Sequence, residues 1–134
     1  MTAKSPNFAA VPVNQFLGFE LRSFAADGAT VVMQPSESVS QEYGVIHGGI
    51  LAALADTAAT YSLRPFLKNG ERMTSIEFKV NFLAPALAGR GEVLAESVVL
   101  RRGRTVAVVQ SSVDQGGKHV MTGIFTYIIL RAEE

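Results

Sequence analysis

The chain has 134 residues, enough for one domain that buries roughly two thirds of the surface exposed by its unfolded form. Its 12 basic and 12 acidic residues balance, so we expect neither nucleic acid nor an anionic membrane as a partner. The absence of Cys excludes disulfides, thiolate metal sites and a cysteine nucleophile. No apolar signal region follows the polar start. We therefore expect one cytoplasmic domain over residues 1–134 without a metal site.

The first part of the chain predicts a short helix and a hairpin. Residues 1–15 form a polar tail followed by a weak helical segment, in which Pro12 is tolerated only near the helix start. Residues 16–25 and 30–34 are rich in strand-forming side chains, and Asp27-Gly28 supplies a turn between them. The polar residues after Pro35 then predict a loop that leads into the central segment.

The central segment predicts a long helix with an unusual composition. Residues 50–63 contain no Lys, Arg or Glu, and their only acidic residue is Asp56. A surface helix normally carries a charged stripe, so we expect this helix to be buried on nearly all sides and to end near Pro65. Helical spacing places Asp56 on a face, away from any solvated stripe, with Gly49, Ala52, Ala53, Thr60 and Leu63.

The rest of the chain predicts strands joined by short turns. Residues 74–83 alternate in polarity, which predicts one buried face with Ile76, Phe78, Val80 and Phe82 and one polar face with Ser75, Glu77, Lys79 and Asn81. Three further strands are expected near residues 92–102, 104–114 and 119–130. The short Gly-containing connections between them predict antiparallel neighbours.

These elements define an α+β domain. About six strands form one antiparallel sheet, which must curl around the single long helix to cover it. One sheet cannot enclose a helix completely, so we expect a second copy of the chain to cover the remainder.

Two glycines at the helix entrance suggest an anion site. The first N–H groups of a helix lack intrahelical partners, and no Ser, Thr, Asp or Asn cap precedes Gly48-Gly49. Such open amides can hold a carbonyl oxygen as it becomes an oxyanion, which indicates acyl-group chemistry. The alternative is that the two glycines only form a tight turn between loop and helix.

Asp56 also has two interpretations. It can be a structural acceptor of hydrogen bonds, or burial can raise its pKa so that it acts as a general base or attacks as a nucleophile. Eight residues of helix separate Asp56 from Gly48 by about 12 Å, so a joint site needs two chains. His47 is the competing base, unless it only bonds loop carbonyls.

Three motifs together resemble a known family. They are Gly44-x-x-His47-Gly48-Gly49, Asp56 within LADTA, and NFLAPA at residues 81–86. From about Gly18 onward the chain resembles the PaaI-like hotdog-fold acyl-CoA thioesterases. The resemblance implies a hotdog fold, hydrolysis of acyl-CoA, and a homodimer or a dimer of dimers. It also implies that coenzyme A is part of the substrate and that no separate cofactor is needed.

The resemblance implies a role for each matching residue. Asp56 would be the nucleophile or general base, and the Gly48 amide would polarise the thioester carbonyl. His47 and Gln41 would position substrate or water, although family members often carry Asn in place of Gln41. Ser75 would help to hold the attacking water. Alternation places Ser75 opposite Phe78, so it would reach the site only at a subunit seam.

The two ends of the substrate would need different surroundings. Gly49 and the apolar pair Phe82-Leu83 would contact the acyl end. Four arginines could bind the phosphates of coenzyme A, unless they are only solvated turn residues: Arg90, Arg101, Arg102 and Arg104.

Two alternatives remain open. Hydratases and dehydratases share the hotdog fold, but their GHFPG-like entrance motif is absent from this sequence. A non-catalytic protein that binds acyl-CoA could use the same cavity, although binding alone would not require a buried Asp56.

Overall fold

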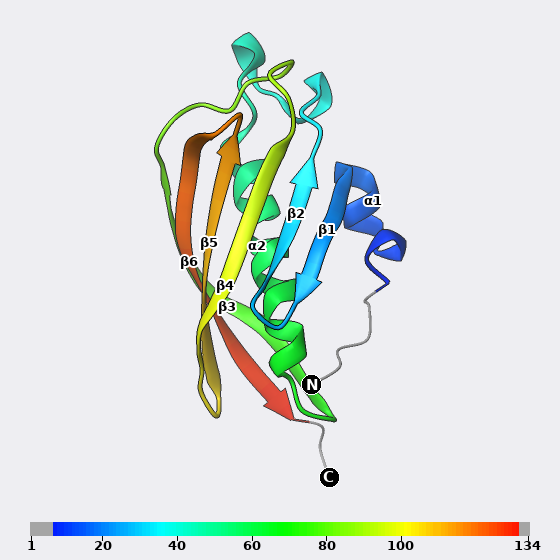
Figure 1. Cartoon of the computed structure of the whole chain (residues 1–134), viewed down its shortest axis with the longest axis vertical. Helices are drawn as coiled ribbons and strands as arrows, with labels where there is room; N and C mark the ends of the chain where they lie inside the picture. Colours follow the sequence, from blue (N-terminus) through cyan, green and yellow to red (C-terminus); the bar gives the residue numbers. More distant parts are fainter. Residues whose placement is uncertain (1–6, 132–134) are drawn as a thin grey trace.

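The computed structural model describes residues 7–131, in which one sheet curls around one long helix (Figure 1). The helices are α1 (Pro12–Leu17) and α2 (Gly48–Leu63). The strands are β1 (Phe19–Ala25), β2 (Gly28–Met33), β3 (Glu71–Phe82), β4 (Val93–Arg102), β5 (Val106–Gln115) and β6 (Lys118–Arg131). Short 3-10 turns lie at η1 (Phe8–Ala10), η2 (Glu37–Val39), η3 (Glu42–Gly44) and η4 (Arg64–Phe66).

The sheet is antiparallel throughout, with the strand order β1-β2-β4-β5-β6-β3. α2 follows β2 in the chain, and β3 then pairs with β6 at the far edge of the sheet. The predicted α+β architecture, one long helix against a curved antiparallel sheet, is confirmed. Across residues 7–131, no helix combines the length and apolar character that crossing a bilayer requires.

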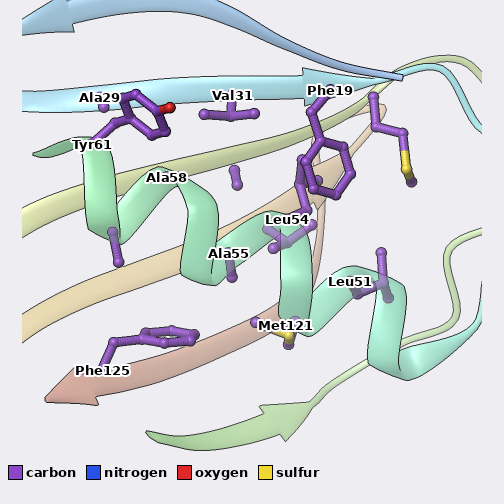
Figure 2. Packing of buried hydrophobic residues seen from close by; sticks show 14 of the residues in the cluster. Phe19, Ala29, Val31, Leu51, Leu54, Ala55, Ala58, Tyr61, Met121 and Phe125 are labelled. Carbon is purple, nitrogen blue, oxygen red and sulfur yellow. The ribbon is translucent and has the colours of Figure 1, made fainter. Parts of the chain in front are cut away.

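Small side chains let α2 approach the sheet closely. Ala55 and Ala58 are fully buried, and Figure 2 shows them with Leu51 and Leu54 between strand residues on both sides of the helix. The Ser97 hydroxyl on β4 donates to the carbonyl of Ala58 at 2.7 Å. The core therefore fixes the position of α2 along its inner side.

The prediction that α2 is buried on nearly all sides is wrong for the single chain. α2 packs mainly against β4, β2 and β5, while half-buried or exposed residues at helical spacing line its other side. Ala52 and Leu63, placed by spacing beside Asp56, are buried. We call this less covered side the open stripe of α2, and it consists of Gly49, Ala53, Asp56 and Thr60, followed by Arg64 at the start of η4.

The prediction of a buried face on β3 is also wrong for the single chain. Ile76 is 55%, Phe78 48% and Phe82 54% exposed. The alternating pattern has the correct period, but β3 is an edge strand whose free side faces solvent. Edge strands with exposed apolar side chains are templates for pairing with another chain.

A bulge corrects the predicted orientation of Ser75. The β3–β6 register shifts between Ser75 and Glu77, so one extra residue is inserted into β3. Ser75 pairs with Tyr127, and Phe78 pairs with Phe125 two residues earlier on β6. Ser75 and Phe78 therefore share the face toward α2, whereas strict alternation had placed them on opposite faces.

The N-terminal boundaries also differ from prediction. Pro12 is the first residue of α1, where a missing N–H costs nothing, and the helix continues to Leu17 instead of ending near residue 15. β1 accordingly begins at Phe19. Phe8 packs its ring against Tyr61 of α2, with the ring centroids 4.8 Å apart. Part of the predicted polar tail, residues 1–6, lies outside the described residues.

Candidate functional site

The entrance of α2 is built where two of the sequence motifs meet. The Ile46 N–H donates to the Ala86 carbonyl, and the Ala88 N–H donates to the Gly44 carbonyl, both at 2.8 Å. Val45 and Leu87 form an isolated antiparallel bridge between the same segments. The segment before His47 and the end of NFLAPA therefore hold each other in place.

His47 caps α2, which corrects the prediction of an uncapped helix. Its Nδ1 accepts a hydrogen bond from the Gly49 N–H at 3.0 Å. A nitrogen that accepts a hydrogen bond carries no proton, so the neutral ring has its proton on Nε2. In this arrangement His47 is a hydrogen-bond donor at Nε2, which suits a positioning role better than that of a base.

The cap leaves one entrance amide open. Ile50 and Leu51 donate to the His47 carbonyl. Among the described residues, no acceptor is recorded for the Gly48 N–H. A Cβ at Gly48 would lie 3.1 Å from the Phe82 ring. The Gly48 amide, which can stabilise an oxyanion, thus lies beside an aromatic side chain.

The other predicted entrance residues lie on the surface. Gln41 is exposed in the loop before α2, where its N–H donates to the Val45 carbonyl at 2.8 Å. Leu83 is 53% exposed just after β3. Tyr43, which no sequence pattern singled out, is 94% exposed and has a φ of 63°. A bulky residue in this left-handed region costs about 1–2 kcal/mol, so the loop stores strain.

The Asp56 carboxylate is held by a residue that sequence reasoning missed. The Tyr127 hydroxyl on β6 donates to Asp56 Oδ1 at 2.6 Å. Thr60, one helical turn beyond Asp56, donates to the same phenol oxygen at 3.4 Å. Tyr127 is only 1% exposed, whereas Asp56 is half-buried on the open stripe.

Burial sets the electrostatics of this pair. It raises the pKa of Asp56 above its ordinary range, and the hydrogen bond from Tyr127 opposes that rise. Burial, together with the charge and hydrogen bond of Asp56, raises the pKa of Tyr127 far above its ordinary value. Tyr127 therefore stays protonated and donating, while Asp56 is a better proton acceptor than an exposed carboxylate.

A cavity of about 600 Å³ is lined by Tyr127, the partner of Asp56, and by Thr60. It lies between the second half of α2 with η4 and the first half of β3. Ser75 lies close enough to the Tyr127 hydroxyl to act on its pKa. The cavity thus offers hydroxyl groups next to Asp56, and its lining is Thr60, Arg64, Leu67, Glu71, Arg72, Met73, Thr74, Ser75 and Tyr127.

The four predicted arginines do not form one patch. Arg90 lies before β4, whereas Arg101 and Arg104 are exposed at the opposite end of that strand, about 30 Å away. Arg102 forms a salt bridge with Glu71 and donates to the Phe66 carbonyl at 3.1 Å. Its guanidinium thus ties β4 to β3 and η4.

The predicted catalytic residues fall into two groups within one chain. His47, Gly48 and Phe82 lie at the entrance of α2, and Asp56 lies with Ser75 two helical turns further along. The rise of a helix separates the two groups by about 12 Å. The sequence could show Tyr127 as an inward strand position, but not which helix residue it faces.

The chain belongs to the thioesterase superfamily, whose family model matches residues 43–122. This confirms the predicted hotdog family, and the chain is a thioester hydrolase by class.

Three relatives illustrate the similarity. The chain is 28% identical over 136 residues to the medium/long-chain acyl-CoA thioesterase YigI of Escherichia coli, covering 89% of this chain and 86% of that one. It superposes on a thioesterase from Haemophilus influenzae with a TM-score of 0.88 at 23% identity, covering 98% and 95% of the two chains. A phenylacetic acid degradation-related protein from Ralstonia eutropha gives 0.81 at 28% identity, covering 90% and 92%.

Proposed function

We propose that this protein hydrolyses acyl-CoA thioesters to a free acid and coenzyme A, with Asp56 as the reacting carboxylate. The single observation that supports this is the Asp56 carboxylate itself. It is half-buried on the open stripe, its Oδ1 is held by Tyr127, and Tyr127 lines a cavity large enough for an acyl group. A binding protein would gain nothing from desolvating a carboxylate there.

The proposed step conserves atoms and charge. With Asp56 as general base, its carboxylate takes a proton from water while the water oxygen bonds to the thioester carbon. The Gly48 N–H stabilises the oxyanion, the carbon–sulfur bond breaks, and the departing thiolate receives the proton from Asp56, which regains its charge. With Asp56 as nucleophile, a mixed anhydride forms first and water then hydrolyses it. Single-turnover hydrolysis in oxygen-18 water distinguishes the two routes.

We further propose that each site combines two subunits. Gly48 and Asp56 lie about 12 Å apart along one helix, too far to act on one carbonyl. A second copy related by a twofold axis would bring its Gly48 amide to Asp56 of the first. The exposed apolar residues of β3 and the open stripe of α2 support such a homodimer, because both lack cover in the single chain.

A dimer of dimers is the larger assembly that we propose. The outer face of β4, β5 and β6, remote from α2, also exposes apolar side chains. They are Val98, Leu100, Val106, Ile124 and Leu130, which are 37–53% exposed. A sheet face that stays in contact with water does not need apolar side chains. A second interface on this face would account for these five residues.

The remaining predicted residues would bind or position the substrate. His47 and Gln41 position the thioester or water at the entrance, and Gly49, Phe82 and Leu83 contact the acyl end. Arg101 and Arg104, which are exposed, are better placed for phosphate binding than Arg102, which is held by Glu71. Arg90 would serve only if the nucleotide reaches the other end of β4. A cytoplasmic location stays a prediction.

The test is thiol release from short, aromatic and long acyl-CoAs. We expect Asp56→Ala and Asp56→Asn to lower kcat by about 10²–10⁴-fold, the usual contribution of a positioned acid or base. Asp27→Asn, at an exposed turn residue, is the matched control and should keep full activity. Hydrolysis that survives both Asp56 substitutions would refute the mechanism. Binding without hydrolysis by the unmodified protein would favour the non-catalytic alternative.

A further inference from the structure

We propose that Tyr127 is a positioning residue that fixes the Asp56 carboxylate, leaving Oδ2 as its reacting oxygen. The proposal rests on the function proposed above for Asp56. Oδ1 accepts the Tyr127 hydroxyl at 2.6 Å, a short distance typical of a hydroxyl donating to a charged oxygen. In the described part of the chain, no group is recorded as donating to Oδ2. Holding one oxygen fixes the plane in which the other can react.

The sheet holds Tyr127 rigidly enough for this role. It lies in a cross-strand row between Ala107 on β5 and Ser75 on β3, with its ring 1% exposed. Small neighbours on both sides leave room for the ring, and its hydroxyl reaches α2. The same hydroxyl lies 3.3 Å from the Asp56 backbone carbonyl. Tyr127 therefore fixes the position of the carboxylate relative to β6 as well as to α2.

The hydrogen-bond pattern also sets the direction in which the proton points. The Thr60 hydroxyl donates to the phenol oxygen at 3.4 Å, so that oxygen accepts from Thr60 while its own proton goes to Asp56. A phenol that stays protonated can only stabilise the charged carboxylate. Tyr127 therefore favours the form of Asp56 that accepts a proton or attacks a carbonyl.

The positioning role predicts a specific response to removal of one hydroxyl. Tyr127→Phe keeps the ring but deletes the donor, so we expect kcat to fall about tenfold to a hundredfold through misplacement of the carboxylate. KM should stay within about threefold because the ring is retained. The hydrogen bond lowers the pKa of Asp56, so its loss should move the acid limb of the kcat profile to higher pH.

Tyr61→Phe is the matched control. Tyr61 is also buried, lies on α2 five residues after Asp56, and has no recorded hydrogen bond to its hydroxyl among residues 7–131. We expect this variant to keep the kcat and the acid limb of the unmodified protein. An equal shift in both variants would show a general effect of losing a buried hydroxyl and would overturn the proposal.

A second measurement keeps the test independent of turnover. Carbon-13 labelling of aspartate carboxyl groups, with Asp56→Asn to assign the signal, follows the Asp56 titration in the intact protein. We expect Asp56 to titrate at higher pH in Tyr127→Phe, provided that the variant melts as cooperatively as Tyr61→Phe. An unchanged titration overturns the positioning role. Because no substrate is present, this result stands even if the thioesterase proposal fails.

Discussion

The entrance and the middle of α2 are organised in different ways. At the entrance, His47 caps the helix through the Gly49 N–H and leaves the Gly48 amide open, so the local sequence builds the site. In the middle, Asp56 depends on Tyr127, which is 71 residues further along the chain. Hydrogen bonds between neighbours in sequence thus set the geometry of the cap, whereas the position of the carboxylate depends on how β6 packs against α2.

The two groups of a two-chain site can thus be held in position before the chains assemble. Each group is held within its own chain. The His47 cap fixes the helix start that carries the Gly48 amide, and the Tyr127 hydroxyl fixes the Asp56 carboxylate. Neither group needs the other for its geometry, yet the helix keeps them about 12 Å apart. Dimerisation would then bring together two groups that are already positioned, which keeps the free-energy cost of ordering the site low.

Removal of the Gly48 N–H tests the role of the entrance. Both Gly48→Pro and Gly48→Ala add a Cβ near Phe82. Only the proline variant removes the backbone N–H, whereas the alanine variant keeps that N–H. Proline is favoured at the first helical position, and His47, with φ −59° and ψ 131°, already suits a residue before proline. We expect kcat of the proline variant to be about 10²-fold below that of the alanine variant.

Thermal melting is the control for this pair, and both variants should unfold at similar temperatures. Equal activity of the two folded variants would show that the Gly48 amide does not stabilise the oxyanion. The entrance would then serve only as a turn, and the contrast between the entrance and the middle of α2 would lose its functional meaning.

A smaller effect tests the middle of the stripe through stability. Burial raises the pKa of Asp56, so the native state binds this proton more tightly than the unfolded state does. The charged carboxylate therefore lowers stability increasingly as pH rises above the ordinary aspartate pKa of about 3.9. Asp56→Asn, which keeps an oxygen for Tyr127, should raise the free energy of unfolding by about 1 kcal/mol at pH 7.

Urea unfolding at pH 7 and near pH 4 measures this effect, with Asp27→Asn as an exposed control. The gain for Asp56→Asn should shrink at the lower pH. A loss of stability at both values would mean that Asp56 is a structural acceptor, as its alternative interpretation holds.

The sequence predicted the fold well because its strongest signals are compositional. The absence of Lys, Arg and Glu from residues 50–63 identified α2, and alternation identified the strands. The error on β3 came from treating a solvent-facing edge as interior, since Ile76 and Phe78 are apolar but exposed. A pattern shows that a side chain needs cover but not whether its own chain supplies it.

The site was predicted only where its parts are local. His47, Gly48 and Asp56 lie close in sequence, so their spacing could be translated into distance along a helix. Tyr127 and the bulge beside Ser75 depend on strand register, which one sequence does not specify. The cap by His47 was missed because histidine is not among the usual capping residues.

In the proposed dimer, one catalytic site takes Gly48 from one subunit and Asp56 from the other. This arrangement is tested most directly by mixing two inactive variants, Gly48→Pro and Asp56→Asn, with different affinity tags and isolating the heterodimer. That heterodimer holds one site with both groups intact and one with both lost. We predict about half of the unmodified activity per dimer. A heterodimer as inactive as its two parents would place Gly48 and Asp56 in separate, single-chain roles and contradict the account.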